Sequence, residues 1–268
     1  MRPPEPLRPA LDLARLDASG WRVEVLEESP STNRHLAGRA RAGAEPGLAV
    51  VAEHQSAGRG RLDRVWVTPA RAALTVSLLV SPDRVPLASW PWLPLLTGLV
   101  VREAVRRAAG VESALKWPND VLVDGRKVAG ILVERVERPA GAVAVVGIGV
   151  NVTTTRDELP VDSATSLLLE GARSVDRTRL LGDLLAEFTR RYDGWVAAAG
   201  EGLRPSYTAA CSTIGRRIRV DLPTGERLDG VAVDVDDDGR LVVEGDRGRR
   251  ALGAGDVVHV RGGNDRPA

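Results

Sequence analysis

A tight hairpin near the middle of the chain constrains the fold more than any other feature. Apolar segments 121–123 and 127–134 flank the dipeptide Asp124-Gly125. This dipeptide favours a two-residue turn, because both residues tolerate positive φ. A regular hairpin then gives these pairs: Val123 with Arg126, Leu122 with Lys127, and Asp120 with Ala129. Asp120 and Lys127 are therefore expected on one face, as diagonal neighbours roughly 7–8 Å apart at the backbone.

The residues that enter this hairpin carry charge. Pro118 favours an extended Trp117 and ends any helix before it, so Lys116 is expected at the mouth of the hairpin. Two lysines and one carboxylate in such a space suit a polyphosphate and its magnesium ion. An exposed hairpin with ordinary solvated charges would contain the same residues, and that alternative stays open here.

A continuous apolar run at 142–152 predicts a strand that is buried on both faces. Gly147, Gly149 and Asn151 are two residues apart, so they share one face. Glycine allows close approach, and this strip is expected to form the floor for a flat ligand. Glycine at a crowded core contact is the alternative. The run is no dinucleotide fingerprint, because Val152 occupies the last glycine position and no helix signal follows.

A third segment, 53–66, alternates glycine with arginine after an apolar strand at 48–52. It places Arg59, Arg61 and Arg64 in one loop. Guanidinium groups match phosphate geometry, and glycine lets backbone amides surround an anion. The loop therefore predicts an anion-binding segment that is mobile until its ligand arrives. A solvated basic loop or a weak nucleic-acid patch is the alternative.

Composition excludes several classes of protein. The net charge of +1 gives no strong steering toward nucleic acid or a membrane. Cys211 is the only cysteine, so neither a disulfide framework nor a thiolate metal site is expected. No apolar run reaches 18 residues and the proline-rich start lacks a signal core. The expected location is the cytoplasm.

The order of elements predicts an α+β fold, since strands and helices do not alternate regularly. Four regions are expected: a flexible lead-in (1–20), a main domain (21–212), a small C-terminal barrel (213–262) and a tail (263–268). Expected strands of the main domain are 21–27, 48–52, 74–80, 121–123, 127–134 and 142–152; expected helices are about 33–42, 89–109 and 177–199. Expected barrel strands are 217–222, 227–235, 240–244, 249–252 and 257–260.

Taken together, these motifs resemble those of the biotin–protein ligases. The matching motifs are Ser31-Thr32-Asn33, Gln55, Gly58-Arg59-Gly60-Arg61 with Trp66, Lys116-Trp117-Pro118-Asn119-Asp120, Lys127 with Ala129-Gly130, and Gly147-x-Gly149-x-Asn151. The resemblance implies a class II synthetase-like mixed sheet flanked by helices, followed by an SH3-like β-barrel. About 30 residues precede Ser31, so the resemblance is to the short form, without an N-terminal DNA-binding domain.

The resemblance also implies the reaction and its ligands. Biotin is activated by ATP as biotinyl-5′-AMP, with Mg²⁺ present, and is then transferred to a lysine of the biotin carboxyl carrier domain of an acyl-CoA or pyruvate carboxylase. No DNA or membrane partner is expected, and the chain is expected to be a monomer or a homodimer.

Roles for individual residues follow from the same resemblance. The implied catalytic residues are Lys127, Arg61, Lys116 and Asp120. The implied biotin contacts are Ser31, Thr32, Asn33, Gln55, Arg59, Gly60, Arg61, Lys127, Gly147 and Gly149. The implied ATP and adenylate contacts are Gly58, Arg59, Arg61, Arg64, Lys116, Asn119 and Asn151. Asp120 and Asn151 are the implied magnesium ligands. Helix capping alone would also explain Ser31 and Thr32.

Two other functions remain possible for such a sequence, and the chain differs from the family motif at one residue of the arginine loop. A lipoate–protein ligase shares the fold and the adenylation chemistry but lacks the Lys-Trp-Pro-Asn-Asp pattern. A non-enzymatic regulator that binds biotin belongs to a different functional class. The family loop commonly has a third glycine where this chain has Asp63. Its carboxylate is expected to pair with Arg61 or Arg64 and weaken their hold on the adenylate.

Overall fold

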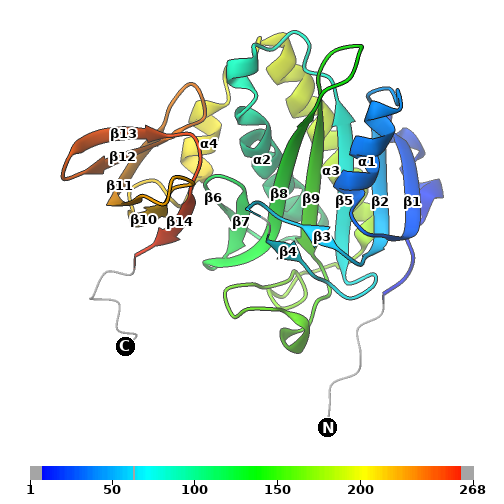
Figure 1. Ribbon diagram of the computed structural model, residues 1–268. Helices are drawn as coiled ribbons and strands as arrows, with labels where there is room; N and C mark the ends of the chain where they lie inside the picture. Colours follow the sequence, from blue (N-terminus) through cyan, green and yellow to red (C-terminus); the bar gives the residue numbers. More distant parts are fainter. Residues whose placement is uncertain (1–7, 63, 261–268) are drawn as a thin grey trace.

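A seven-stranded mixed sheet forms the centre of the molecule (Figure 1). The computed structural model describes residues 8–62 and 64–260; predictions for residues 1–7, Asp63 and 261–268 lie outside these ranges. In spatial order the strands are β1 (Arg22–Ser29), β2 (Leu48–Gln55), β5 (Ala73–Val80), β9 (Val143–Asn151), β8 (Arg126–Val136), β7 (Asp120–Val123) and β6 (Ala114–Lys116). Only β1 and β2 run parallel; the other neighbours in this sheet are antiparallel. The predicted α+β class is confirmed.

Helices cover both faces of this sheet. Helix α1 (Thr32–Arg41) lies on one face, while α2 (Trp92–Ala109) and α3 (Arg177–Ala197) lie on the other. Strand β9 shows the alternation: Val145 packs with α1, whereas Val146 packs in the core beneath α2 and α3. The odd-numbered residues that follow Val145 along β9 continue on the α1 face, and these are the two glycines and the asparagine of the predicted floor.

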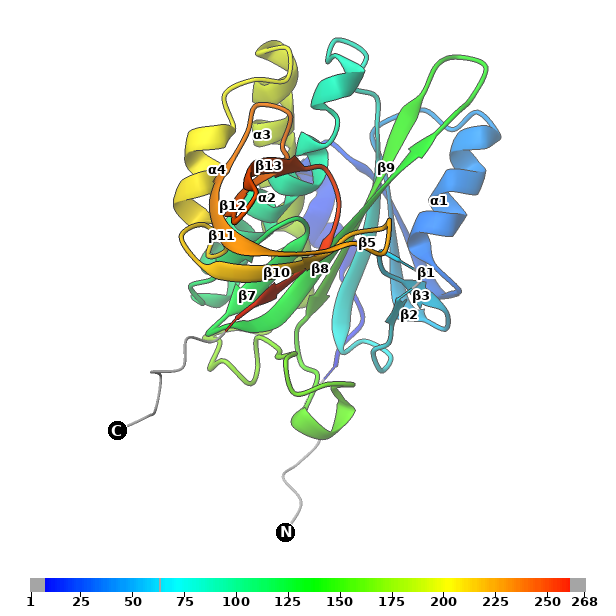
Figure 2. The ribbon, with the colours of Figure 1, turned by 60° about the vertical axis from the view of Figure 1, so that its left-hand side comes forward.

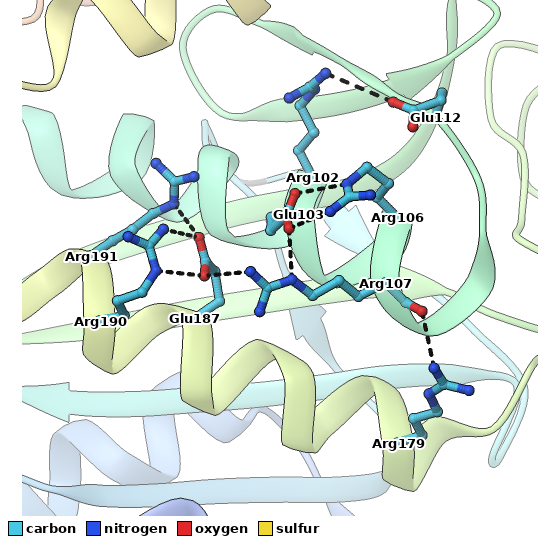
Figure 3. A network of polar contacts seen from close by, with 9 residues as sticks. All are labelled: Arg102, Glu103, Arg106, Arg107, Glu112, Arg179, Glu187, Arg190 and Arg191. Atoms are coloured by element: carbon cyan, nitrogen blue, oxygen red, sulfur yellow. Dashed lines mark hydrogen bonds and ion pairs between the residues drawn. The ribbon is translucent and has the colours of Figure 1, made fainter.

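An ion-pair network joins α2 to α3 on the outer side of the molecule (Figure 3). The buried carboxylate of Glu187 contacts Arg190 at 2.6 Å and Arg191 at 2.5 Å on its own helix, and Arg107 of α2 at 3.5 Å. Arg107 also pairs with Glu103 at 2.6 Å. Hydrogen bonding, first from Arg106, lowers the pKa of Glu103 to about 2. The network therefore stays charged at neutral pH and fixes the helices that support the sheet.

A five-stranded antiparallel sheet follows helix α4 (Arg204–Ala210). In spatial order its strands are β13 (Gly248–Leu252), β12 (Leu241–Gly245), β11 (Arg227–Val235), β10 (Arg217–Asp221) and β14 (Asp256–His259). All five predicted strands are confirmed. The indole N–H of Trp92 donates to Asp237 O at 2.7 Å, and that of Trp117 donates to Gly239 O at 3.1 Å. These bonds attach the β11–β12 turn of the small sheet to the main domain.

The segment before β1 also lies on the main domain. A short 3₁₀ helix (Leu13–Ser19) contacts α3. The backbone N–H of Leu11 donates to Glu53 Oε1 at 2.8 Å. Glu53 is buried and pairs with Arg177 at 2.6 Å, and Arg177 in turn donates to Pro9 O at 2.6 Å. A buried charge pair thus ties this part of the predicted lead-in to β2 and α3.

Candidate active site

A cavity of about 1240 Å³ lies on the α1 face of the sheet. Its wall includes the loop after β2, the segment 160–164, and strand β14 of the small sheet. The predicted site residues that line it are Ser31, Thr32, Asn33, Gln55, Arg59, Gly60, Arg61, Arg64, Lys116, Asn119, Asp120, Lys127, Gly147, Gly149 and Asn151. Gly58 is the exception. It is buried where β3 (Gly58–Arg59) meets β4 (Val65–Trp66), and an added Cβ would lie 2.9 Å from Gln55 Nε2.

The hairpin register differs from the regular one that the sequence suggested. The turn pairs Val123 with Arg126 and Leu122 with Lys127, as expected. A bulge at Val128 then shifts the register, so Asp120 lies opposite Gly130 and not Ala129. Val128 and Ala129 are both completely buried in the core. The bulge therefore lets two consecutive side chains face inward while Lys127 and Gly130 both face the cavity.

The predicted neighbours Lys127 and Asp120 form an ion pair through their side chains. Lys127 Nζ lies 2.6 Å from Asp120 Oδ1 and 5.8 Å from the centre of the Trp66 ring. The Lys127 side chain crosses Gly130, where an added Cβ would be 3.0 Å from Nζ. The absence of a side chain at Gly130 thus leaves room for the ammonium group beside the Asp120 carboxylate.

A row of paired residues crosses the sheet beneath the cavity. In register, Thr75 lies opposite Gly149, Gly149 opposite Gly130, Gly130 opposite Asp120, and Asp120 opposite Lys116. Paired residues share a face and adjacent strands lie about 4.8 Å apart. Lys116 is therefore roughly 10 Å from Gly130 along the row. Burial lowers the pKa of Lys116, against the opposing influence of Asp120.

A polar cluster occupies the opposite end of the cavity, next to α1. Gln55 Oε1 accepts from the backbone N–H of Thr32 at 2.8 Å and from its hydroxyl at 3.1 Å. The buried Ser77 hydroxyl lies 2.8 Å from Thr32 Oγ1 and 2.6 Å from Asn33 Oδ1. Asn33 Nδ2 donates to Glu134 Oε2 at 2.8 Å. The cluster is a fixed array of donors and acceptors, as recognition of a small polar ring requires.

Ser31 serves as the N-cap of α1, and its hydroxyl accepts from Arg34 N at 3.4 Å. Capping therefore accounts for this serine structurally, as the sequence alternative allowed. Ser31 also lines the cavity.

The glycines of β9 are covered by side chains. A Cβ on Gly147 would lie 2.8 Å from Asn33 Cγ, and a Cβ on Gly149 would lie 2.7 Å from the Trp66 ring. The structure thus shows the crowded contact that the sequence left open, while both glycines also line the cavity. Asn151 follows on the same strand, and its Nδ2 donates to Thr165 O at 2.9 Å.

All three arginines of the loop have partners in the structure, although the sequence predicted a loop that is mobile until its ligand arrives. Arg59 lies 3.3 Å from Glu134 Oε1, and Arg64 pairs with Asp256 of the small sheet. Arg61 donates to Asn119 Oδ1 at 3.2 Å and is within 3.5 Å of Gly255 O. Burial lowers the pKa of Arg61. The loop is thus attached to β8, to the Lys-Trp-Pro-Asn-Asp turn and to the small sheet.

Two parts of this site were absent from the sequence analysis. The segment 160–164 received no role from the sequence, yet it lines the cavity, and Ser163 O accepts the backbone N–H of Lys127 at 2.7 Å. The wall also includes β14 of the small sheet and Arg216, the residue before β10. Neither carries a local motif, so only the folded chain brings them to the site. Glu134 and Ser77 were also missed, because one polar residue within an apolar strand has many structural explanations.

No group of three or more His, Cys, Asp or Glu residues that could hold a metal ion occurs within 8–62 and 64–260. In the same ranges, no helix is both long and apolar enough to cross a membrane.

Comparison with known proteins gives the family. The profile described as "Biotin/lipoate A/B protein ligase family" matches residues 25–151, and "Biotin protein ligase C terminal domain" matches residues 213–260. The "Biotin--[acetyl-CoA-carboxylase] ligase" of Mycobacterium tuberculosis is 43% identical over 97% of this chain and 98% of its own length. The "Bifunctional ligase/repressor BirA" of Bacillus subtilis is 32% identical over 87% of this chain and 72% of its own length.

A solved structure agrees with these sequence matches. The biotin protein ligase from Aquifex aeolicus in complex with biotin and ATP superposes with a TM-score of 0.75 at 27% identity, covering 90% of this chain and 99% of that chain. The first profile describes both biotin and lipoate ligases, whereas the second profile describes biotin protein ligases only. The chain belongs to the biotin protein ligase family.

Proposed function

We propose that this protein activates biotin with ATP and transfers it to a lysine of a biotin carboxyl carrier domain. One observation carries the proposal: a single cavity joins the polar cluster of α1, the Lys127–Asp120 pair and the arginine loop. The relatives named above supply the substrate class. ATP as co-substrate suits a reaction in the cytoplasm.

The chemistry has two steps. A biotin carboxylate oxygen attacks the α-phosphorus of ATP, the bond from that phosphorus to the bridging oxygen of the β-phosphate breaks, and pyrophosphate leaves. The uncharged amine of the acceptor lysine then attacks the acyl carbon of biotinyl-AMP. The acyl C–O bond breaks, AMP leaves, and the new amide nitrogen loses a proton. Neither step requires a protein nucleophile, so catalysis depends on positioning and on charge stabilisation.

The residues divide this work along the cavity. Thr32, Asn33 and Gln55 would hold the ureido ring of biotin at the polar cluster. Lys127 would lie over the reacting carboxylate and α-phosphate, where its charge offsets the repulsion between two anions. Arg59 and Arg61 would cover the adenylate and exclude water from the mixed anhydride.

Magnesium would be held together with the nucleotide. Mg²⁺ commonly uses one or two protein carboxylates, phosphate oxygens and water. Asp120 offers a carboxylate and Asn151 an amide oxygen on the cavity wall, which fits this mode. When bound, the ion would neutralise charge on the phosphates. Asp120 would meanwhile hold Lys127 in place through their ion pair.

The test is incubation of the protein with ATP, biotin and a purified carrier domain, followed by streptavidin detection. Labelling of one carrier lysine is expected, and lipoate in place of biotin should give no product. Efficient lipoate transfer without biotin transfer would favour the lipoate–protein ligase alternative. Biotin binding with no adenylate formed would favour the non-enzymatic regulator.

A further inference from the structure

The carboxylate of Glu134 on β8 contacts two residues of the cavity that lie in different segments of the chain. Its Oε2 accepts from Asn33 Nδ2 of α1 at 2.8 Å, and its Oε1 accepts from Arg59 Nη1 at 3.3 Å. Asn33 and Arg59 line the cavity, whereas Glu134 does not. Glu134 therefore acts on a ligand of the cavity through these two residues.

The fold brings Asn33 and Glu134 together across a glycine of β9. Helix α1 packs on the end of β8 and the start of β9, next to the connection between these strands (Figure 2). Gly147 of β9 lies opposite Leu132 of β8, and Glu134 follows two residues later on the same face. An added Cβ on Gly147 would lie 2.8 Å from Asn33 Cγ, so the asparagine side chain extends over this glycine. Beyond it, the side chain reaches Leu132 O and the Glu134 carboxylate.

These two contacts fix the orientation of the Asn33 amide. Its Nδ2 donates to Leu132 O at 3.1 Å as well as to Glu134, and a carbonyl and a carboxylate can only accept. The reversed amide would place Asn33 Oδ1 against both oxygens without a hydrogen between them, which is unfavourable at a buried site. Asn33 Oδ1 consequently faces Ser77.

The orientation of Asn33 gives a direction to the hydrogen bonds of the polar cluster. Asn33 Oδ1 has no hydrogen, so the Ser77 hydroxyl donates to it at 2.6 Å. Ser77 has then used its only proton, and its 2.8 Å contact with Thr32 takes the hydrogen of the Thr32 hydroxyl, which also lies 3.1 Å from Gln55 Oε1. From Thr32 through Ser77 and Asn33, each donor thus points toward Glu134.

Glu134 prevents this hydrogen-bond chain from reversing. Hydroxyl groups rotate and amides can turn over, so a chain of neutral groups could run in either direction and present either pattern of donors and acceptors. The carboxylate at its end cannot donate, and only one direction remains. A fixed pattern recognises a ring with its own fixed donors and acceptors better than a pattern that can reverse, because no ordering is needed on binding.

The contact with Arg59 leaves this effect intact. The two contacts use different oxygens of Glu134, so a bound phosphate can take Arg59 while Oε2 retains Asn33. The Glu134 and Arg59 side chains are 29% and 39% exposed, whereas Asn33 is buried. The exposed ion pair is the weaker of the two interactions.

Resting on the function proposed above, we infer that Glu134 is a positioning residue for biotin: it holds the hydrogen-bond chain of the polar cluster in the direction that matches the ureido ring. It does so through Asn33, without contact to the ligand. Removal of its charge therefore weakens biotin binding only while Asn33 is present.

The experiment is a double-mutant cycle in the full chain, with Glu134→Gln, Asn33→Ala and the double variant. Glutamine has the size of glutamate but can donate, so the hydrogen-bond chain can then reverse. The control is Glu137→Gln: Glu137 follows the end of β8, pairs with Arg135 at 2.7 Å and does not line the cavity. The dissociation constant of biotin is measured by calorimetry, and urea unfolding of each variant reports on the fold.

Glu134→Gln should raise the dissociation constant of biotin about tenfold, as loss of one hydrogen bond to a charged group does, and Glu137→Gln should leave it unchanged. In the Asn33→Ala background, Glu134→Gln should have no further effect. An unchanged constant in Glu134→Gln would overturn the inference. A further tenfold loss in the Asn33→Ala background would also overturn it, because Glu134 would then act through Arg59 or the fold. Failure of the proposed function is distinguishable, since the unsubstituted protein itself would then form no biotinyl-AMP.

Discussion

Replacement of Lys127 by glutamine separates its proposed catalytic role from its structural one. Lys127 Nζ contacts Asp120 Oδ1 at 2.6 Å, but the lysine side chain is 34% exposed and that of aspartate 19%. Exposed ion pairs contribute about 0.2–1 kcal/mol to stability. Glutamine is one bond shorter than lysine, but it keeps an uncharged N–H donor that can face Asp120. The free energy of unfolding should therefore fall by roughly 1 kcal/mol or less.

The effect on adenylation should be much larger. A charge that is held in place over the reacting anions typically contributes about 10²–10³ in rate, or about 2.7–4 kcal/mol. We expect Lys127→Gln to slow pyrophosphate release in a single turnover by this factor. The energy lost in the transition state thus exceeds the energy lost on folding, and this difference identifies the group as catalytic.

The assay pairs single-turnover pyrophosphate release with urea unfolding of the same samples. Arg135→Gln is the matched control: Arg135 lies on the same strand, pairs with Glu137 at 2.7 Å, and does not line the cavity. The control should lose a similar small amount of stability and no activity. A rate for Lys127→Gln within threefold of the unsubstituted protein would refute the role of Lys127.

Three further predictions follow from the same geometry. Gly147→Ala should displace Asn33, destabilise the fold by about 1–3 kcal/mol and weaken biotin binding as measured by calorimetry. The control is Gly38→Ala, whose added Cβ has nothing within 4 Å. Equal biotin affinity in both variants would contradict the prediction. Residues 57–66 should gain protection from hydrogen exchange when biotin and ATP are added. The exposed ion pairs of Arg59 with Glu134 and of Arg64 with Asp256 are weak, so these arginines can bind phosphate instead. Unchanged protection would argue against closure of the loop over the ligand. The pKa of His259 is lowered from 6.5 to about 4, so the folded chain binds fewer protons than the unfolded chain between these pH values, and stability should be lost as the pH falls through that window. Urea unfolding at several pH values should show a smaller loss of stability in His259→Gln. Identical pH profiles of the two proteins would contradict this prediction.

The hairpin shows how far local chemistry determines structure. Asp124-Gly125 was sufficient to predict the turn and the two pairs next to it. It was not sufficient for the pair at Asp120, because the bulge at Val128 serves the packing beneath α2 and α3. That packing depends on residues far away in the sequence. The conclusion that Lys127 and Asp120 share a face was nevertheless confirmed, by a register that differs from the predicted one.

The small sheet shows the complementary case. Its five strands alternate clearly and were predicted close to their observed bounds, because the period of two is a local property. Its part in the cavity was not predicted, because nothing in Arg216 or His259 marks them as neighbours of Lys116. Their position depends on the hydrogen bonds that link Trp117 to Thr213, about a hundred residues later in the sequence, and Thr213 to His259.

The same hydrogen bonds explain why both domains line one cavity. The Lys-Trp-Pro-Asn-Asp turn has its tryptophan N–H groups bound by Thr213 and by Gly239, both from the C-terminal part of the chain. Its asparagine accepts from Arg61, which also lies within 3.5 Å of Gly255 O. The position of Lys116 and that of the arginine loop are thus set against the same small sheet. A shift of that sheet would therefore move the end of the cavity that contains Lys116 while leaving the polar cluster of α1 in place.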